Sequence, residues 1–272
     1  MEIRKDSGIM KWILIGISFL FLGVFLLLPL FYIIATAFRD GIGGYLVAVT
    51  DEYAIKAALL TLKATLISVL INTFFGLAAA WCLTKFAFKG KKILSTFIDL
   101  PVTVSPIIAG LIYVLTFGRQ GILYKYLDPY GIQIIFAVPG IVLATIFVTF
   151  PFISRELIPV LTAQGTDEEE AAALMGAKTF TIFRKVTLPH IKWALLYGVV
   201  LCTARAMGEF GAVSVLSGHL RGKTNTLPLY IELLYQGYDF TGAFAASSIL
   251  VIMAIIILIL RLLLQNKGKR EV

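Results

Sequence analysis

The sequence predicts an all-α membrane protein, polytopic, with six transmembrane helices in a single transmembrane domain over residues 1–272. The first observation is composition: 59% of the 272 residues are hydrophobic and only 15% are charged, whereas soluble domains carry about 25% charged residues. The second is a mean hydropathy of +0.91. The third is that charged residues separate long apolar runs, none of which alternates like a membrane β-strand. These features exclude a soluble domain and a disordered chain.

Six apolar runs are each long enough to cross a bilayer. A hydrocarbon core about 30 Å thick needs roughly 20 apolar residues as a helix. A spanning backbone must also satisfy its polar groups within each segment, which favours helices. The first run is too long for the h-region of a cleavable signal peptide, which has about 7–15 residues. The runs are Trp12–Phe38, Ala64–Thr84, Ile93–Gly118, Pro129–Ser154, Trp193–Gly218 and Phe240–Leu260.

The distribution of Lys and Arg predicts the orientation. The two tails, the loop after the second run and the loop after the fourth run together carry 16 of the 24 Lys and Arg residues, and the three other loops carry 7. Because the side richer in Lys and Arg is normally cytoplasmic, we expect both termini inside a cell (inner) membrane that the chain crosses several times. The net charge of +8 then suits an anionic lipid surface, and no nucleic-acid partner is expected.

The third run contains a predicted break. Asp99 lies close to Pro101 and Pro106, and proline interrupts the hydrogen-bond ladder of a helix. We therefore expect this span to be broken or displaced near these residues.

The loop after the fourth run, residues 155–192, is the longest polar segment, and the topology places it in the cytoplasm. Four consecutive acids at positions 167–170 follow Thr166. Thr166 and Glu169 have the spacing of a capping box, which predicts the start of a helix. Gly176 can end that helix in a left-handed turn. A second short helix is expected after it, closed by Pro189.

The same loop contains Glu170-Ala171-Ala172, then Gly176 after three residues, and Val186-Thr187-Leu188-Pro189 after nine more. This pattern resembles the EAA loop of ABC importer permeases, which usually has Ile at the position of Val186. It implies a type I ABC importer permease fold and a coupling segment that docks in a groove on a separate ATPase subunit. It also implies that ATP is bound by that partner, so no cofactor is expected on this chain.

The fifth run carries Arg205 and Glu209, four residues apart. On one helix they would share a face with the small residues Gly198, Cys202 and Ala212, and such a face should meet protein or water rather than lipid. Two interpretations stay open. Arg205 could belong to an anion pathway, or Arg205 and Glu209 could form a structural ion pair, with Asp99 as a further possible partner of Arg205.

A second resemblance covers the chain from about residue 55 to its C-terminus. Residues 98–101, 136–145, 204–219 and 221–229 are similar to W-type permease subunits of sulfate/thiosulfate ABC importers. This implies a second permease subunit of the T-type, two ATPase subunits and an extracytoplasmic sulfate-binding protein. Backbone N–H groups and hydroxyls, such as those of Ser105, Ser214 and Ser217, would then form a weak transit site.

Other functions are less consistent with the sequence. Molybdate or tungstate permeases share Gly208–Gly211, so these oxyanions are the alternative substrates. A secondary anion carrier would explain Arg205 and Glu209 but not the loop, and no catalytic or metal-ligand set is visible. The segment Gly218–Thr224 has three residues between its glycines, whereas a phosphate-binding Walker A loop needs four.

Overall fold

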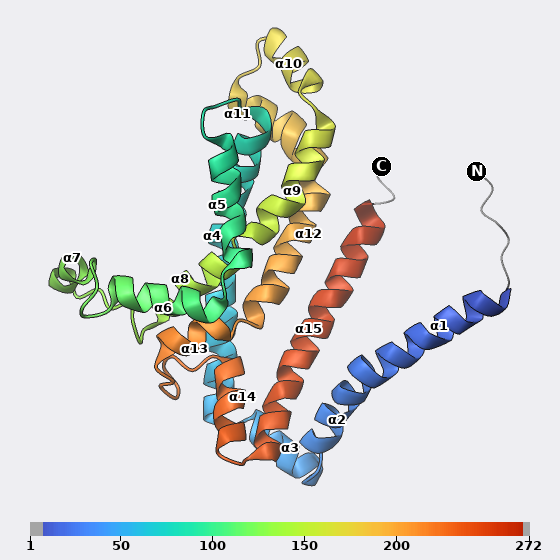
Figure 1. Ribbon diagram of the computed structural model, residues 1–272, viewed down its shortest axis with the longest axis vertical. Coiled ribbons are helices and arrows are strands. Elements are labelled where there is room, and N and C mark those ends of the chain that lie inside the picture. The colour runs from blue at the N-terminus through green and yellow to red at the C-terminus, as the bar shows by residue number, and fades with distance from the viewer. Residues whose placement is uncertain (1–7, 269–272) are drawn as a thin grey trace. The chain divides into compact units, whose positions relative to one another are not determined.

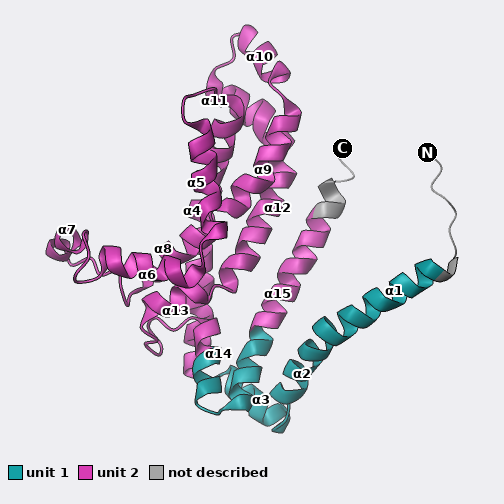
Figure 2. Cartoon of the chain, viewed as in Figure 1, with its two compact units in different colours: residues 1–51, 231–249 teal, residues 52–230, 250–272 magenta. Residues whose placement is uncertain are grey.

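The computed structural model describes the backbone of residues 8–268 and the side chains of residues 10–264, and every regular element within this part is a helix (Figure 1). The all-α prediction is confirmed. The chain forms two compact units: residues 1–51 with 231–249, and residues 52–230 with 250–272 (Figure 2). The expectation of one permease domain over residues 1–272 stays a prediction. The predicted tail residues Arg4, Lys5, Lys269 and Arg270 lie outside the described part.

The described elements follow one another in this order. The first seven are α1 (Gly8–Leu22), the π-helical turn η1 (Gly23–Leu27), α2 (Leu28–Ala37), α3 (Gly41–Val49), α4 (Glu52–Lys85), α5 (Lys91–Thr103) and α6 (Pro106–Phe117). Next come α7 (Tyr124–Leu127), the 3-10 turn η2 (Asp128–Tyr130), α8 (Val138–Thr149), α9 (Pro151–Gln164) and α10 (Asp167–Leu174). The last are α11 (Thr179–Ile182), the π-helical turn η3 (Phe183–Thr187), α12 (Leu188–Met207), α13 (Gly211–Ser217), α14 (Leu227–Gln236) and α15 (Phe240–Gly268).

The predicted membrane crossings are present as five continuous helices and one broken span. The continuous ones are Met10–Ala37, Glu52–Lys85, Val138–Gln164, Thr179–Met207 and Phe240–Leu264. The broken one is α5 with α6, which bend by 108° at the link between them. Pro101 lies inside α5, Pro106 begins α6, and Val104 between them is extended. The break predicted near Asp99 is therefore confirmed.

The ends of several spans differ from the sequence prediction, most clearly in the fourth and fifth. The fourth span begins at Val138 rather than Pro129 and continues to Gln164, so Arg155 lies inside a helix. The fifth span begins at Thr179 and ends at Met207, and α13 follows as a separate short helix. Counting charges missed these ends because a helix can continue through polar residues once its other face is packed.

The first unit contains the least buried of the apolar helices. Its span Met10–Ala37 has no buried residue in its most apolar window, which suits a helix facing lipid or another chain. The parts of this unit are joined by specific contacts. Tyr32 packs edge-to-face on Phe244 with the ring centres 5.7 Å apart, and the hydroxyls of Tyr45 and Ser248 lie 3.0 Å apart.

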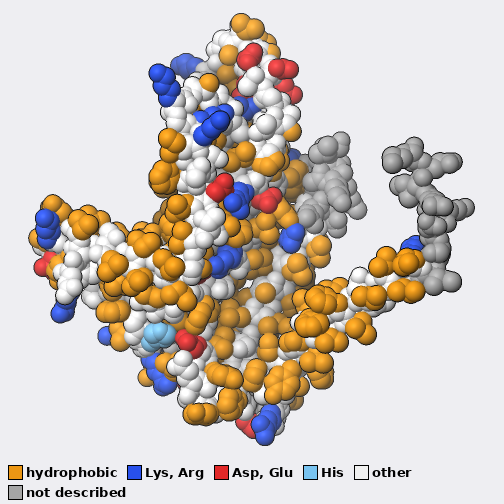
Figure 3. Space-filling view, viewed as in Figure 1, with side chains coloured by type: hydrophobic (Ala, Val, Ile, Leu, Met, Phe, Trp, Pro, Cys, Tyr) orange, Lys and Arg blue, Asp and Glu red, His pale blue; other side chains and the backbone are white. Residues whose placement is uncertain are grey.

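The second unit is organised around α4, which belongs to two apolar cores along its length. One core joins Leu60 and Ala64 of α4 to α8 and α13. The other joins Val69 and Ala80 to α9 and α12, and the three helices of this core run side by side in Figure 1. Hydrophobic side chains are widespread on the visible surface, and charged ones lie in several groups, among them one around the α10 end of this unit (Figure 3).

Small residues allow α13 to lie directly against α6. A Cβ on Gly110 would come within 2.7 Å of the Ala212 carbonyl oxygen, and a Cβ on Gly211 within 2.9 Å of Pro106 Cβ. Close approach of helix backbones through small residues is typical of membrane helix packing. The link between α12 and α13 is thereby held against the broken span.

Candidate functional site

The acidic helix α10 lies between two glycines with left-handed backbone. Gly165 has φ +70° and Gly176 has φ +84°. A residue with a side chain pays about 1–2 kcal/mol for this conformation. At the end of the helix the N–H of Gly176 donates to Ala173 O (2.9 Å), and the N–H of Ala177 donates to Ala172 O (3.1 Å). The predicted left-handed turn at Gly176 is confirmed.

The tip of this segment projects apolar and acidic side chains. Glu170 and Ala171 are exposed, whereas Ala172 is buried and attaches the helix to the rest of the unit. Beyond them Leu174 is 90% exposed and Met175 82% exposed, followed by Phe180 at 73%. Large exposed apolar side chains beside charges are a feature of surfaces that bind another protein.

The structure corrects the expected second short helix and its closure at Pro189. From Thr179 the helix continues without interruption to Met207. The turn η3 is π-helical, and the N–H of Leu188 donates to Phe183 O, five residues back. This wider turn allows Pro189 to lie in the first turn of α12. At that position the helix does not need the N–H group that proline lacks. Leu188 packs on the core of α9 and α12.

Glu169 has a different role from the capping group that its spacing predicts. Thr166 makes no side-chain capping bond. Instead, the Glu169 carboxylate lies 3.0 Å from Lys85 Nζ at the end of α4 and accepts a 2.7 Å hydrogen bond from the Thr187 hydroxyl. Lys85 also donates to Gly165 O. We call these contacts the Glu169 junction. No local spacing links Lys85 to Glu169, so the sequence analysis missed both Lys85 and Thr187.

Arg205 and Glu209 form an ion pair, with Arg205 Nη1 2.7 Å from Glu209 Oε2. The Glu209 side chain is 1% exposed and that of Arg205 is 32% exposed. Glu209 Oε1 also accepts a 2.9 Å hydrogen bond from the N–H of Ala212. The predicted single helical face is wrong, because α12 ends at Met207 and Glu209 lies in the link to α13. The carboxylate therefore joins the end of α12 to the start of α13.

Asp99 pairs with Arg155 rather than with Arg205. Arg155 Nε lies 2.7 Å from Asp99 Oδ1, and the two side chains are 48% and 45% exposed. The pair joins α5 to α9. From the sequence, Arg155 is expected at the start of a loop, where no pairing with Asp99 is predicted.

The three predicted pathway serines have different surroundings. Ser105 is exposed at the break before α6. The Ser214 hydroxyl donates to Gly211 O inside its own helix, and the buried Ser217 hydroxyl accepts from the N–H of His219. The hydroxyls of Ser214 and Ser217 are thus engaged in local structure, and the pathway role of all three stays a prediction.

The loop Gly218–Thr224 is closed by its own residues. Thr224 Oγ1 donates to Ser217 O and accepts from the N–H of Leu220. These bonds satisfy the hydroxyl within the turn.

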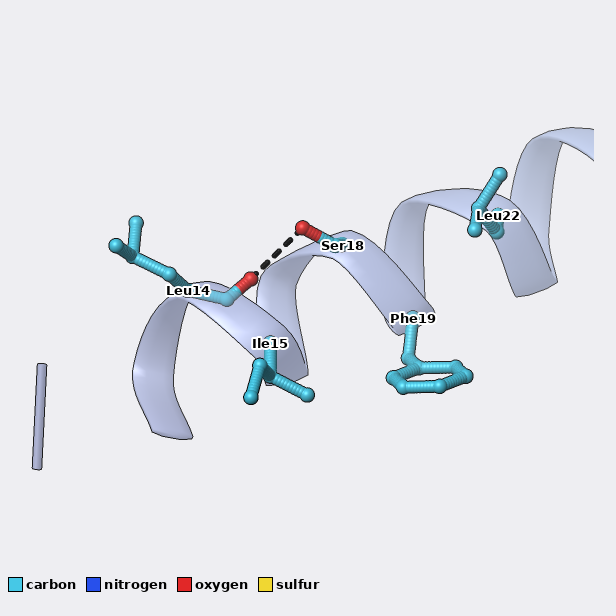
Figure 4. Close-up of a pocket in the computed structure, with 5 residues that line it drawn as sticks. All are labelled: Leu14, Ile15, Ser18, Phe19 and Leu22. Atoms are coloured by element: carbon cyan, nitrogen blue, oxygen red, sulfur yellow. Dashed lines mark hydrogen bonds between the residues drawn. The ribbon is translucent and has the colours of Figure 1, made fainter. Parts of the chain in front are cut away.

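Two of the surface hollows in the described part are lined by none of the predicted pathway residues. One of about 230 Å³ follows α1 and is lined by Leu14, Ile15, Ser18, Phe19 and Leu22 (Figure 4). Its one hydroxyl, Ser18, already donates to Leu14 O. The other, about 770 Å³, is formed within residues 114–136, where a hydrogen bond to Asp128 raises the pKa of Tyr124. Neither gathers several cations around one point, as a tight anion site would require.

Residues 72–269 match the family described as binding-protein-dependent transport system inner membrane component. The chain is 51% identical over 264 residues to the sulfate transport system permease protein CysW of Escherichia coli K12, covering 96% of this chain and 91% of the relative. It is 46% identical over 269 residues to CysW of Synechococcus elongatus, covering 99% and 94%.

More distant relatives share the same fold. The chain is 34% identical over 258 residues to the sulfate transport system permease protein CysT of Salmonella typhimurium, covering 95% of this chain and 93% of the relative. A crystal structure of a bacterial ABC transporter that imports alginate has a TM-score of 0.78 and 20% identity, covering 96% of both chains. The chain therefore belongs to the family of inner membrane components of binding-protein-dependent transport systems.

Proposed function

We propose that this chain is the W-type permease subunit of an ATP-driven importer of sulfate or thiosulfate and forms half of the translocation pathway. The observation that carries the proposal is the 51% identity to CysW over 96% of the chain. The exposed tip of α10, with Glu170 beside apolar side chains, is suited to docking on an ATPase. The chain itself is a non-catalytic subunit, and ATP hydrolysis belongs to the partner.

The proposed assembly contains a T-type permease, two ATPase subunits and an extracytoplasmic sulfate-binding protein. The similarity to CysT supports a paralogous second permease. A binding protein is supported by the related alginate transporter, whose structure was solved with a substrate-bound periplasmic protein. The barely buried span Met10–Ala37 offers an apolar surface for the lipid or for the second permease.

Within this assembly, the chain would convert ATPase closure into a change in the side to which the pathway opens. Such a conversion requires contacts that differ between two states. A transit site should bind a dianion weakly, and the strong binding should belong to the delivery protein. Arg205 and Arg155 each already face a carboxylate within 2.7 Å, which reduces the free positive charge that either offers to sulfate.

Transport should require ATP and the complete complex. The chain would be reconstituted in vesicles with its T-type, ATPase and binding-protein partners. We expect these vesicles to take up radiolabelled sulfate only when ATP is present in the lumen, on the same side of the membrane as the ATPase. Thiosulfate should compete with this uptake more strongly than molybdate. Uptake driven by an ion gradient without ATPase would establish a secondary carrier, and preferential molybdate uptake would establish the rival oxyanion importer.

Both termini are proposed to be cytoplasmic. Reporter domains fused after Lys92 or Val272 should be active in the cytoplasm, and reporters near Asp128 or Gly222 should be active outside, because of the Lys and Arg distribution. Fusions to alkaline phosphatase and to a fluorescent protein measure this directly.

Contacts within the second unit support the same arrangement. Lys85 and Glu169 bring two proposed cytoplasmic loops together, and the N–H of Phe136 donates to Leu216 O beside the proposed outer loop. An external C-terminus would contradict the six-span topology.

A further inference from the structure

The Glu169 junction connects the coupling segment to α4. We propose that Lys85 is a positioning residue that ties α10 to α4, so that a displacement of α10 by the ATPase is transmitted along α4 into the membrane. The inference rests on the proposed function, because it assumes that an ATPase docks on α10. It adds the connection through which this docking acts.

Few other contacts hold α10 in place. Left-handed glycines, Gly165 and Gly176, stand on both sides of it. Among the eight described residues of α10, Ala172 alone is buried. Of its four acids Glu169 is the one turned inward, and the other three are exposed. Outside the junction, Glu168 Oε2 lies 3.3 Å from His190 Nδ1 of α12, and this contact is exposed. The junction is therefore the buried ionic link between α10 and the membrane helices.

The junction itself is buried and has several bonds. The Lys85 side chain is 6% exposed and that of Glu169 is 15% exposed, with 3.0 Å between the charged atoms. Thr187, wholly buried in η3, donates to the same carboxylate. Loss of either charge would leave the other uncompensated in a poorly hydrated place. We expect α10 to swing outward in that case, because the glycine turns permit it and water then solvates the charge.

Aromatic packing strengthens the same end of α4. The ring of Trp81 lies one turn before Lys85, with its centre 5.1 Å from the ring of Phe183 in η3. It also meets Phe86 edge-on at 5.6 Å. Contacts with η3 thus orient the last turn of α4, and the ionic contact adds α10 to this arrangement.

From this end α4 continues through both cores of the second unit. It is one helix of 34 residues, about 50 Å long at 1.5 Å per residue. The C-terminal half of α4, with Val69 and Ala80, packs on α9 and α12. The N-terminal half, with Leu60 and Ala64, packs on α8 and α13. Motion of the Lys85 end therefore reaches α9, which carries Arg155, and also α12 and α13, whose link carries Glu209.

The test compares Lys85→Met, Lys85→Arg, Glu169→Gln and the double variant Lys85→Met with Glu169→Gln in the full complex in vesicles. We expect Lys85→Met to keep ATP hydrolysis but to lower sulfate taken up per ATP at least about tenfold, because removing one member of a buried pair costs more free energy than a tenfold change represents. Lys85→Arg keeps the charge and the donors, so it should stay coupled. Lys89→Met, an exposed lysine of the same loop, is the matched control and should transport like the wild type.

The double variant distinguishes a positioning role of Lys85 from the cost of burying an unpaired charge. It leaves no unpaired charge, so it should reach normal membrane abundance. If Lys85 positions α10, the double variant should remain uncoupled. Full recovery of coupling in the double variant would overturn the proposal, as would wild-type coupling in Lys85→Met. If Lys85→Met fails to accumulate, the double variant decides the question. Absence of ATP-driven sulfate uptake by the wild-type complex would instead defeat the proposed function.

Discussion

Replacing Arg205 with Met is expected to remove most of the chain from the membrane. The Glu209 carboxylate, 1% exposed and 2.7 Å from Arg205, would lose its counter-charge. Breaking a buried pair by removing one partner costs about 3–5 kcal/mol, a large part of the roughly 5–15 kcal/mol that stabilises a typical fold. Membrane abundance, measured by quantitative immunoblotting, should fall severely.

The opposite single change should be milder. Glu209→Gln keeps an oxygen that can accept from the N–H of Ala212, and it leaves Arg205, whose side chain is 32% exposed, with access to polar surroundings. We expect a loss of about 1 kcal/mol, the usual net value of one hydrogen bond. The two single variants should therefore differ markedly in abundance, with Arg205→Met the lower.

The double variant Arg205→Met with Glu209→Gln separates the two interpretations of the pair. We expect it to recover abundance and sulfate uptake, because no unpaired charge remains and the bond to Ala212 can persist. Recovered abundance with lost uptake would place Arg205 in the anion pathway. Arg155→Met is the matched control: its pair with Asp99 is nearly half exposed, so the loss of abundance should be smaller.

Gly176→Val is expected to abolish coupling while leaving the chain in the membrane. At φ +84° a β-branched residue is strained by about 1–2 kcal/mol or more. A Cβ at this position meets no atom within 4 Å, so the cost comes from the backbone and stays local. The turn after α10 should change shape and weaken the ATPase contact. Co-purification of the ATPase and sulfate uptake measure the loss.

A matched control is Gly43→Val, because Gly43 also has open space around it but no left-handed backbone. That variant should remain coupled. Glu170→Lys should resemble Gly176→Val, since it reverses the charge of an exposed side chain on the docking tip. Normal ATPase binding and transport by both Gly176→Val and Glu170→Lys would remove the coupling role from this segment.

The sequence determined those features that depend on local patterns. Long apolar runs predicted the spans because each run must satisfy its backbone within itself in lipid. Pro101 and Pro106 predicted the break between α5 and α6, and Gly176 predicted the left-handed turn. Each of these depends on the intrinsic conformational limits of one or two residues, so distant packing was not needed to anticipate them.

Helix ends were less predictable. Counting charges ended the fourth run at Ser154, but packing of Ile153, Leu157 and Leu161 on α4 and α12 extends the helix past Arg155. A π-helical turn likewise carries the chain through Pro189. Burial of one helix face outweighed the local signals in both places.

The pairing of the charges followed from tertiary packing. Local spacing suggested Glu169 as a cap, and Asp99 was one possible partner of Arg205. Packing instead brings Lys85 to Glu169 and Arg155 to Asp99. Arg205 and Glu209 were found from the sequence because they are neighbours along the chain, although the helix between them ends at Met207. Ion pairs between distant segments depend on how helices pack and on which carboxylates lose water, and neither is encoded in local spacing.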